Sequence, residues 1–386
     1  MPAPTPPGGL PRLSPEEQLR YGRHLVLPEV GPLGQRRLKA ARVLLVGAGG
    51  LGSPVALYLA AAGVGTLTIV EADRVEASNL QRQVLHGTAQ VGRKKGESAR
   101  DRLRDLNPHV DVALEDRWFS VENALELVRA HDLVVDGTDS FATRYLVNDA
   151  CVLAGKPNFY GSVFRFEGQA SVFCAPGGPC YRCLYPEPPP PDLVPSCAEG
   201  GVLGVVPGLV GVVQASEVLK WLTGAGTPLV GRLLLVDALG PEFRTVKVNR
   251  DPLCPACGTR QIRELREDPR YCRPGHPAPE TAVPTIEPDE LRERLGRGDD
   301  LDLVDVREPD EWGGGHLAGA RLVPLSQLGE HLGSFAPDRE VVLYCSAGGR
   351  SERAARQLLE RGLTRVRNLS GGIRRWVEEM GPSLEL

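Results

Sequence analysis

The chain has 386 residues, of which 41% are hydrophobic and 24% are charged, and its formal net charge is −4. This composition excludes a mostly disordered protein, and the length predicts two or three domains. No run approaches the roughly 20 apolar residues of a membrane helix, and no excess of cations favours nucleic acid. The N-terminus lacks the pattern of a signal peptide. We therefore expect a cytoplasmic protein that binds neither a membrane nor nucleic acid directly.

The first part of the chain has an α/β pattern. Residues 1–13 are rich in Pro and Gly, which predicts a flexible N-terminus, and Ser14-Pro15-Glu16-Glu17 is typical of a helix start. This first helix is expected to reach about Leu25. Short apolar runs then alternate with helical segments, which predicts a parallel sheet buried on both faces. We expect strands at 43–46, 66–70, 133–136 and 233–236, paired strands within 161–173, and helices at 51–62 and 214–222.

A second α/β pattern begins after a stretch rich in Pro and charged residues. That stretch, 266–283, predicts an interdomain linker. The domains are therefore expected at 14–265 and 284–386. In the smaller domain, strands are expected at 301–306 and 341–344, and helices at 288–295 and 352–360.

A glycine-rich segment lies between the first predicted strand and the following helix. Gly47-Ala48-Gly49-Gly50-Leu51-Gly52 has the pattern GxGxxG, which lets phosphate approach the N-terminus of a helix. Glu71 ends the next strand, where a carboxylate can bind ribose hydroxyls, and Asp73 follows it. These features suit a dinucleotide such as NAD as well as ATP, and a turn without a ligand is the third alternative.

The segments that follow favour ATP. Residues 73–83 form a hydrogen-bonding run, and cations follow at 93–95. The carboxylates of Asp136-Gly137-Thr138-Asp139 come after the third strand, so they fall at the carboxyl edge of the sheet. Cations together with a carboxylate able to hold Mg²⁺ suit a triphosphate under attack, and a redox dinucleotide needs neither.

These motifs, in this order, resemble the ubiquitin-activating-enzyme superfamily over residues 19–258, and most closely its molybdopterin-synthase and thiamine-biosynthesis adenylyltransferases. The resemblance implies a Rossmann-like adenylation domain that uses ATP and Mg²⁺ and forms a homodimer. It implies phosphate-binding cations at Arg82 and Lys95, a Mg²⁺ carboxylate at Asp139, and an arginine, Arg23, that reaches the neighbouring subunit's ATP. Glu71 matches a ribose-binding carboxylate that is Asp in many relatives. The nucleotide residues are then expected to be Gly47, Gly49, Gly50, Gly52, Glu71, Asp73, Ser78, Asn79, Leu80, Gln81, Arg82, Lys95, Asp139 and Arg23.

The nine cysteines are too few for a disulfide scaffold, and their number is odd. Two CxxC pairs, Cys180/Cys183 and Cys254/Cys257, can enclose a tetrahedral Zn²⁺ and tie distant segments together. Redox dithiols are the alternative, and the resemblance favours zinc. A further cysteine, Cys197, lies in a polar segment, where the resemblance implies a thioester or disulfide link to a carrier protein. The remaining cysteines of the first part and the linker (Cys151, Cys174, Cys272) are expected to be structural.

The C-terminal part resembles the rhodanese family over residues 284–382, through the segments 305–312, 315–320 and 371–376. At its centre Cys345 follows a strand and precedes a helix, where backbone N–H groups stabilise a thiolate or persulfide. Arg350 is expected to add a positive charge. The alternatives are an inert loop cysteine or a tyrosine phosphatase, whose loop has one more residue before the arginine.

Together the two parts resemble fused adenylyltransferase–sulfurtransferases. The resemblance implies adenylation of the C-terminal glycine of a ubiquitin-like sulfur carrier ending in Gly-Gly. A persulfide on Cys345, loaded by a donor such as a cysteine desulfurase, would then give a thiocarboxylate for molybdenum cofactor, thiamine or thiolated-tRNA synthesis. The alternatives are an activator that keeps the carrier as a thioester on Cys197, an NAD-binding oxidoreductase, and a scaffold without catalysis.

Overall fold

The computed structural model describes residues 9–188, 201–266, 283–381 and 384–385. The chain divides into two compact units, Met1–Tyr271 and Cys272–Leu386. Most of the linker expected at 266–283 lies outside the described residues, so the boundaries 14–265 and 284–386 stay predictions.

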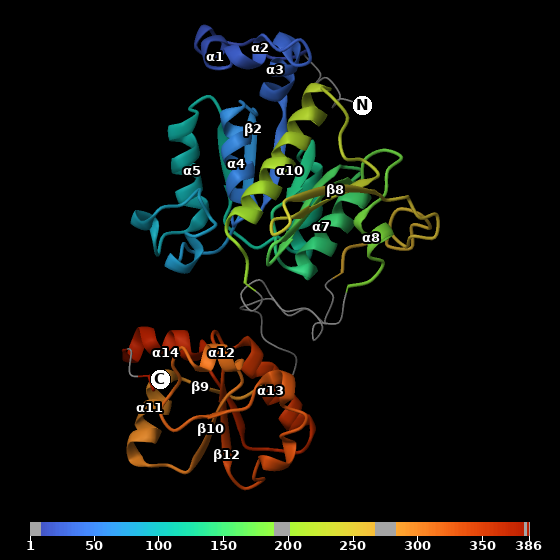
Figure 1. Ribbon diagram of the computed structural model, residues 1–386. Helices are drawn as coiled ribbons and strands as arrows, with labels where there is room; N and C mark the ends of the chain where they lie inside the picture. The colour runs from blue at the N-terminus through green and yellow to red at the C-terminus, as the bar shows by residue number, and fades with distance from the viewer. Residues whose placement is uncertain (1–8, 189–200, 267–282, 382–383, 386) are drawn as a thin grey trace. The chain divides into compact units, whose positions relative to one another are not determined.

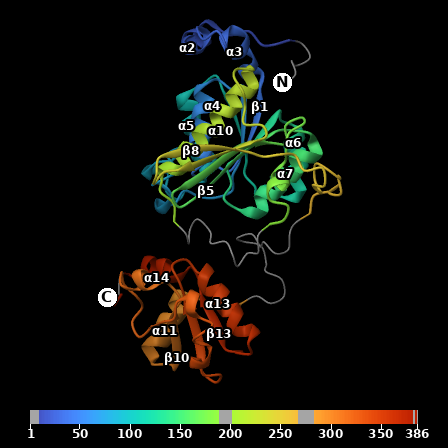
Figure 2. The same ribbon diagram turned by 45° about the vertical axis from the view of Figure 1, so that its right-hand side comes forward.

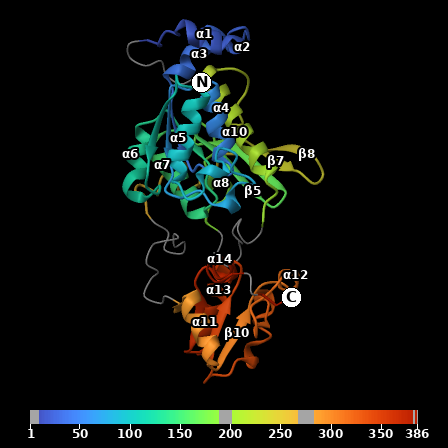
Figure 3. The same cartoon turned by 90° about the vertical axis from the view of Figure 1, so that its left-hand side faces the viewer.

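The first unit is built on a mixed eight-stranded sheet with the order β3-β2-β1-β4-β5-β6-β7-β8 (Figure 1). The first five strands are parallel, and β5 to β8 pair antiparallel, with β8 at the outer edge (Figure 3). The Rossmann-like fold class is confirmed. The strands are β1 (Arg42–Val46), β2 (Thr66–Val70), β3 (Asp111–Glu115), β4 (Leu133–Asp136), β5 (Asn158–Phe164), β6 (Glu167–Phe173), β7 (Arg232–Asp237) and β8 (Glu242–Lys247).

Helices cover both faces of this sheet (Figure 2). One face packs against α4, α5 and α10, and the other against α6 and α7. The helices are α1 (Pro15–Arg20), α2 (Gly22–Leu25), α3 (Gly31–Ala40), α4 (Gly52–Ala61), α5 (Lys95–Leu106), α6 (Val121–Arg129), α7 (Phe141–Ala154), α8 (Tyr181–Leu184) and α10 (Val205–Thr223).

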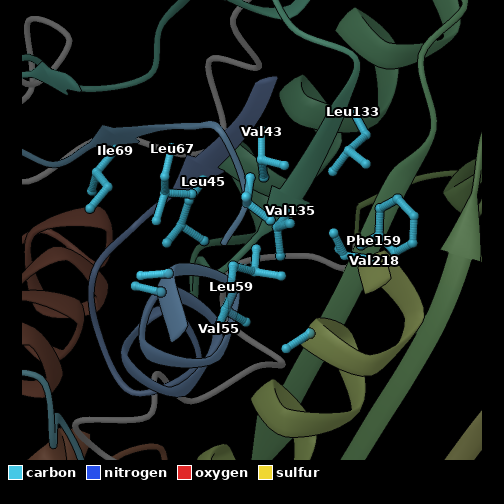
Figure 4. Close-up of a cluster of buried hydrophobic side chains, with 14 of the residues drawn as sticks. Val43, Leu45, Val55, Leu59, Leu67, Ile69, Leu133, Val135, Phe159 and Val218 are labelled. Carbon is cyan, nitrogen blue, oxygen red and sulfur yellow. The ribbon is translucent and has the colours of Figure 1, made fainter. Parts of the chain in front are cut away.

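The continuous apolar runs of the central strands are explained by this two-sided burial. In β1, Val43 and Leu45 lie in one cluster with Val55 and Leu59 of α4 (Figure 4). Leu44 belongs to the cluster on the other face, with residues of α6 and α7. All five side chains are fully buried. The strands expected at 43–46, 66–70, 133–136 and 233–236 are therefore confirmed to within two residues.

Helix α10 is longer than the sequence predicted. The expected helix was 214–222, but α10 begins at Val205. Its first half contains Gly211, where a Cβ would lie 2.5 Å from Pro54 and 2.6 Å from the carbonyl oxygen of Leu51. The glycine therefore allows close packing on α4, although glycines weaken a helix signal in the sequence. By length and composition α10 could cross a membrane, but half of it is buried in this core, as is usual for the central helix of a folded domain.

Two expectations at the N-terminus need correction. The predicted helix 15–25 is divided at Tyr21 into α1 and α2, although Ser14 caps it as expected through a capping box with Glu17. Residues 10–12 belong to the segment predicted as flexible, yet their carbonyl oxygens accept hydrogen bonds from Arg36 and Lys39 of α3. The part of this segment that is described is therefore anchored.

The second unit is a smaller parallel sheet with the order β11-β10-β12-β13-β9. Helix α13 covers one face, and α11 and α14 cover the other (Figure 1). This confirms the predicted second α/β domain. The elements are β9 (Thr285–Ile286), α11 (Pro288–Arg297), β10 (Leu301–Asp305), α12 (Pro309–Trp312), β11 (Arg321–Leu322), β12 (Glu340–Tyr344), α13 (Gly349–Glu360), β13 (Val366–Leu369) and α14 (Gly372–Met380).

Candidate functional site

The carboxyl ends of β1 and β4 lie side by side at the point where the strand order reverses. Val46 pairs with Asp136 in the last register of the two strands. Open α/β sheets bind ligands at this place. The loop after β1 has Gly47 at φ +92, and a Cβ on Gly52 would overlap the carbonyl oxygen of Gly47. These two positions require glycine because the turn folds back on the start of α4.

The other two glycines of the motif let side chains of other segments lie close to the loop. A Cβ on Gly50 would lie 3.5 Å from the side chain of Arg82 and 3.2 Å from Pro207, and one on Gly49 would lie 3.6 Å from Gln83. The half-buried side chain of Arg82 thus runs over the loop, and its guanidinium donates to the carbonyl oxygen of Ser78. The structure therefore places a cation beside the expected phosphate site.

Glu71 connects the glycine loop to the segment after β2. The backbone N–H of Ala48 donates to one of its carboxylate oxygens (2.9 Å), and that of Asp73 donates to the other (2.9 Å). The side chain is nearly buried. Each oxygen keeps a second lone pair, so the carboxylate can hold the loop and still accept from a ribose hydroxyl.

The two adjacent lysines at the start of α5 have different surroundings. The ammonium group of Lys95 is buried and lies 3.1 Å from Asp73, whereas half-buried Lys94 pairs with Asp116. Of these two side chains, that of Lys95 pairs with the segment that follows β2. Lys95, the lysine expected at the phosphates, therefore differs from Lys94 in its burial and in its ion-pair partner.

Residues 78–81 form the rim of the same edge. Asn79 is buried, and its side-chain oxygen accepts from the backbone N–H of Glu76, whereas Ser78 and Gln81 are exposed and Leu80 is half-buried. Backbone and side-chain atoms of Gln81 leave no room for a Cβ at position 204, just before α10. The rim is therefore fixed against the N-terminus of α10.

Of the two carboxylates at the end of β4, Asp136 and Asp139, the first is buried and the second is exposed. Thr138 donates from its backbone N–H and its hydroxyl to buried Asp136, whose pKa is raised by burial. Asp139 is exposed at the same edge. Buried Arg144 of α7 donates to the carbonyl oxygen of Thr138, and this hydrogen bond stabilises the turn. Asp139 is the carboxylate in a position to meet a cation in solvent.

Arg23 lies at the opposite end of the sheet. It is exposed on α2, directly after Tyr21, and the ring of Tyr21 lies where a Cβ of Gly63 would be, just before β2 begins. Arg23 therefore belongs to the amino edge of the strands, and the structure does not bring it to the other nucleotide residues of its own chain.

The four cysteines of the CxxC pairs come together although about 70 residues separate the pairs. All four sulfur atoms lie within 4.8 Å of one another. The distances are 3.6 Å between Cys180 and Cys254, 3.3 Å between Cys183 and Cys257, and 4.0 Å between Cys180 and Cys183. Tetrahedral Zn²⁺ with bonds of about 2.3 Å needs sulfur atoms about 3.8 Å apart, so the set fits this ion. Burial raises the pKa of the Cys183 thiol to about 11, whereas hydrogen bonds outweigh burial at Cys257 and lower the pKa of its thiol.

Two further cysteines of the first unit are described, and neither is one of these four. Cys151 is buried in the apolar core, where burial raises its pKa, and Cys174 contacts Asn148. Both surroundings agree with structural roles. Cys197 and Cys272 lie outside the described residues.

In the second unit Cys345 follows β12 directly and is 2% exposed. Its sulfur accepts from the backbone N–H of Gly348 (3.2 Å) and from the hydroxyl of Ser351 (3.4 Å). Two carbonyl oxygens of this loop accept hydrogen bonds from the first turn of α14. Ile373 donates its N–H to Cys345 (2.8 Å), and Arg374 donates its N–H to Ser346. These contacts fix the start of the loop in which the N–H of Gly348 meets the sulfur.

Arg350 is not an isolated charge on this loop. Its guanidinium forms two hydrogen bonds to Glu311, of 2.6 and 2.8 Å. The hydrogen bond from Arg350 lowers the pKa of Glu311 to about 2. The positive charge expected beside Cys345 is therefore offset by a carboxylate, which corrects the simple expectation from the sequence.

Several residues of these sites were not singled out by the sequence. Glu311 lies 39 positions before Arg350, so only the fold brings the two together. Arg144 and Gln214 carry no motif, yet Gln214 donates to the carbonyl oxygens of Asp136 and Phe159 and so fixes the end of β4. The glycine pair 371–372 was recognised as part of a motif, but its contact with the Cys345 loop was not foreseen.

Comparisons with known proteins fit this geometry. The ThiF family matches residues 21–256, and the rhodanese-like domain matches residues 287–379. The chain belongs to the ThiF family. Its ThiF domain is followed by a rhodanese domain, and the two together make it a transferase with adenylyltransferase and sulfurtransferase domains.

The names of two relatives of this ThiF protein combine adenylyltransferase and sulfurtransferase. The probable adenylyltransferase/sulfurtransferase MoeZ of Mycobacterium tuberculosis is 50% identical over 382 residues, which are 96% of each chain. Adenylyltransferase and sulfurtransferase MOCS3 of Mus musculus is 48% identical over 333 residues, 84% of this chain and 72% of the relative.

Another relative is matched over a shorter part of this chain. The sulfur carrier protein adenylyltransferase of Thermus thermophilus is 55% identical over 267 residues, 68% of this chain and 98% of the relative. Among solved structures, Escherichia coli MccB with AMPCPP and MccA has a TM-score of 0.57 at 23% identity, covering 63% of this chain and 75% of that one. That likeness shows the shared fold.

Proposed function

We propose that this protein adenylates the C-terminal glycine of a ubiquitin-like sulfur carrier and then transfers sulfur to it from a persulfide on Cys345. The observation that carries the proposal is the coexistence of a complete glycine-loop edge in the ThiF domain and, in the rhodanese domain, a cysteine sulfur that accepts from a backbone N–H and a hydroxyl. An NAD oxidoreductase would have no use for the second. A carboxylate is a poor acyl donor, and adenylation provides AMP as the leaving group.

The first step takes place at the carboxyl edge of β1 and β4. The carrier carboxylate attacks the α-phosphorus of ATP, pyrophosphate leaves, and an acyl-adenylate remains. Arg82 and Lys95 supply positive charge toward the phosphates, and Glu71 holds the glycine loop while accepting from the ribose. Preorganised cations at a developing charge are a large source of rate enhancement.

Two metal ions accompany this proposal. Asp139 would hold Mg²⁺, because an exposed carboxylate at this edge supplies the hard oxygen that Mg²⁺ prefers. When bound, Mg²⁺ neutralises charge on the phosphates. The four cysteines, Cys180, Cys183, Cys254 and Cys257, would hold a structural Zn²⁺ that ties the segment after β6 to the segment after β8.

The second step uses the rhodanese loop. The outer sulfur of a Cys345 persulfide attacks the acyl carbon, AMP leaves, and an acyl disulfide remains. Attack of the Cys197 thiolate on the Cys345 sulfur would release the carrier thiocarboxylate and leave a disulfide for an external thiol to reduce. We propose a persulfide donor such as a cysteine desulfurase as the sulfur source, and a cytoplasmic site of action.

The carrier has a candidate docking surface beside the nucleotide edge. Phe166, Leu203, Leu239 and Phe243 are exposed, large and apolar. The turns that carry the first three are adjacent, since Ala238 donates its N–H to Phe166 and Leu203 donates its N–H to Arg165. An exposed apolar patch of this kind marks a protein interaction site.

We further propose a homodimer, supported by a second apolar surface. Val205, Leu209 and Val212 of α10 are exposed at spacings of four and three residues, which places them on one stripe of the helix. Tyr58, which is also exposed, belongs to α4, against which α10 packs. A dimer through this face accounts for exposed apolar residues on an otherwise buried helix, and it leaves Arg23 available to a partner subunit's site.

The experiment that tests the proposed function is mass analysis of candidate Gly-Gly carriers. Each carrier is incubated with the enzyme, ATP, Mg²⁺ and a sulfur donor, and the expected change is the replacement of one oxygen by one sulfur. Cys345→Ala should retain carrier-dependent pyrophosphate exchange and lose the sulfur gain. Exchange without any sulfur gain in the wild type would contradict the sulfur step, whereas a stable thioester in the Cys345→Ala protein would favour the conjugating activator.

A further inference from the structure

The rim of the persulfide loop carries an ion pair that the proposed chemistry does not use. Glu311 of α12 accepts from both terminal nitrogens of Arg350, at 2.6 and 2.8 Å. The hydroxyl of Ser346, the residue after the nucleophile, donates to the same carboxylate (2.8 Å) and accepts from Arg350 (3.0 Å). These three side chains form a hydrogen-bonded network next to Cys345.

This network decides how much positive charge the loop presents. The Arg350 guanidinium is 15% exposed and the Glu311 carboxylate 31%, so the pair is partly shielded from water. The pKa of Glu311 is held at about 2 by Arg350, so both partners are charged throughout the neutral range. Their net charge is zero, and the direct contacts to the Cys345 sulfur come from the backbone N–H of Gly348 and the Ser351 hydroxyl.

Sulfur donors differ in the charge that must approach the Cys345 thiolate. With thiosulfate, the thiolate attacks the outer sulfur of a dianion, the S–S bond breaks, and sulfite leaves as a dianion. With methanethiosulfonate, the same attack on a monoanion releases methanesulfinate. The repulsion between nucleophile and donor is larger for the dianion, and a free guanidinium at the rim would offset it.

We propose that Glu311 is a positioning residue that selects the sulfur donor, because by holding Arg350 it denies dianionic donors a cation and favours donors of lower charge. The inference rests on the proposed function, in which Cys345 carries the persulfide. It adds to that function a preference of the rhodanese domain for protein or small-molecule persulfides over inorganic thiosulfate.

The test is steady-state sulfur transfer from thiosulfate and from methanethiosulfonate to cyanide, using the full-length protein. Glu311→Gln keeps an amide oxygen that can accept from Ser346 but removes the charge that holds Arg350. We expect the KM for thiosulfate to fall about tenfold and that for methanethiosulfonate to fall less, with kcat little changed. The gain for thiosulfate should shrink as salt is added, since screening weakens the freed charge.

A matched control breaks a similar ion pair elsewhere in the domain. Glu340 accepts from both terminal nitrogens of Arg294, at 2.9 and 3.0 Å, and starts β12, whereas Cys345 follows the end of that strand. Glu340→Gln should leave the KM values for both donors unchanged.

Three results would overturn the inference. The KM for thiosulfate could be unchanged in Glu311→Gln, it could change by the same factor as that for methanethiosulfonate, or both rates could fall together as expected for mere support of the loop. Mass analysis of Cys345 in the wild type separates these results from a deeper failure. If neither donor leaves a cyanide-labile sulfur on Cys345, the proposed sulfur step fails, and this inference fails with it.

Discussion

The ammonium nitrogen of Lys95 lies 3.1 Å from a carboxylate oxygen of Asp73, and Lys95 is only 6% exposed. A buried lysine is rare unless it is paired, so this side chain is held at the nucleotide edge rather than free in solvent. Its neighbour Lys94 is half-buried and pairs with Asp116. The two lysines therefore form a matched pair for mutation.

We expect Lys95→Met to lower carrier-dependent ATP–pyrophosphate exchange about 100-fold, because it removes a preorganised charge from the phosphates. Lys94→Met should change the rate by less than about twofold, since an exposed ion pair contributes little. Both variants should bind zinc and unfold as the wild type does. Equal losses in the two variants would show that the structure does not distinguish the catalytic lysine.

The cysteine cluster leads to a prediction about metal content. The purified protein should hold one zinc ion per chain, and Cys254→Ser should abolish it and lower the Tm by roughly 10 °C, because a structural metal contributes directly to folding. Cys174→Ser is the control, since Cys174 contacts Asn148 and is not one of the four clustered cysteines. A metal-free protein whose Tm does not respond to added zinc would contradict the proposal.

Gly372 determines whether the persulfide loop can form. It has φ +63, and a Cβ there would overlap the carbonyl oxygen of Cys345 and lie 2.8 Å from the backbone nitrogen of Ala347. Gly372→Ala should therefore abolish sulfur transfer and leave pyrophosphate exchange intact. Gly296→Ala, with nothing within 4 Å of its Cβ, should affect neither activity. Wild-type sulfur transfer in Gly372→Ala would refute this account of the loop.

These predictions also show what the sequence can and cannot supply. The strand β1 was found because its residues are apolar on both faces, and the glycine loop because its spacing has a physical cause. The first half of α10 was missed because glycines that allow close packing on α4 look like helix breakers when they are read without the partner helix. Contacts between residues that are far apart in the sequence are harder to predict. The contact between Glu311 and Arg350 spans 39 positions, and no pattern in the sequence around either residue predicts it.

A pH effect on stability follows from His131. Its ring nitrogens bond to the carbonyl oxygen of Leu127 (2.6 Å) and the hydroxyl of Thr68 (2.7 Å), and burial lowers its pKa below the usual 6.5. The unfolded chain therefore takes up a proton at this histidine before the folded protein does. Stability from this group is complete above about pH 6.5 and is lost as the pH falls toward the folded-state pKa.

The measurement is the Tm between pH 7.5 and 5.5. We expect the decrease with falling pH to be smaller in His131→Gln, which cannot gain a proton, than in the wild type. The same substitution at exposed His331 should leave the pH dependence unchanged. If His131→Gln and the wild type gave parallel curves, the neutral form of His131 would not contribute to stability in the way the structure indicates.

The last prediction concerns the placement of Arg23 at the amino edge of the sheet, away from Lys95 at the carboxyl edge. If each nucleotide site takes Lys95 from one subunit and Arg23 from the other, Arg23→Ala and Lys95→Met should each be inactive as a homodimer. When the two are co-expressed, the mixed dimer has one site with both residues intact and one with neither. Random pairing should then restore about one quarter of the wild-type pyrophosphate exchange. A chain that carries both substitutions, expressed alone, should show no pyrophosphate exchange. If mixed dimers form but remain inactive, Arg23 does not act across the subunit boundary.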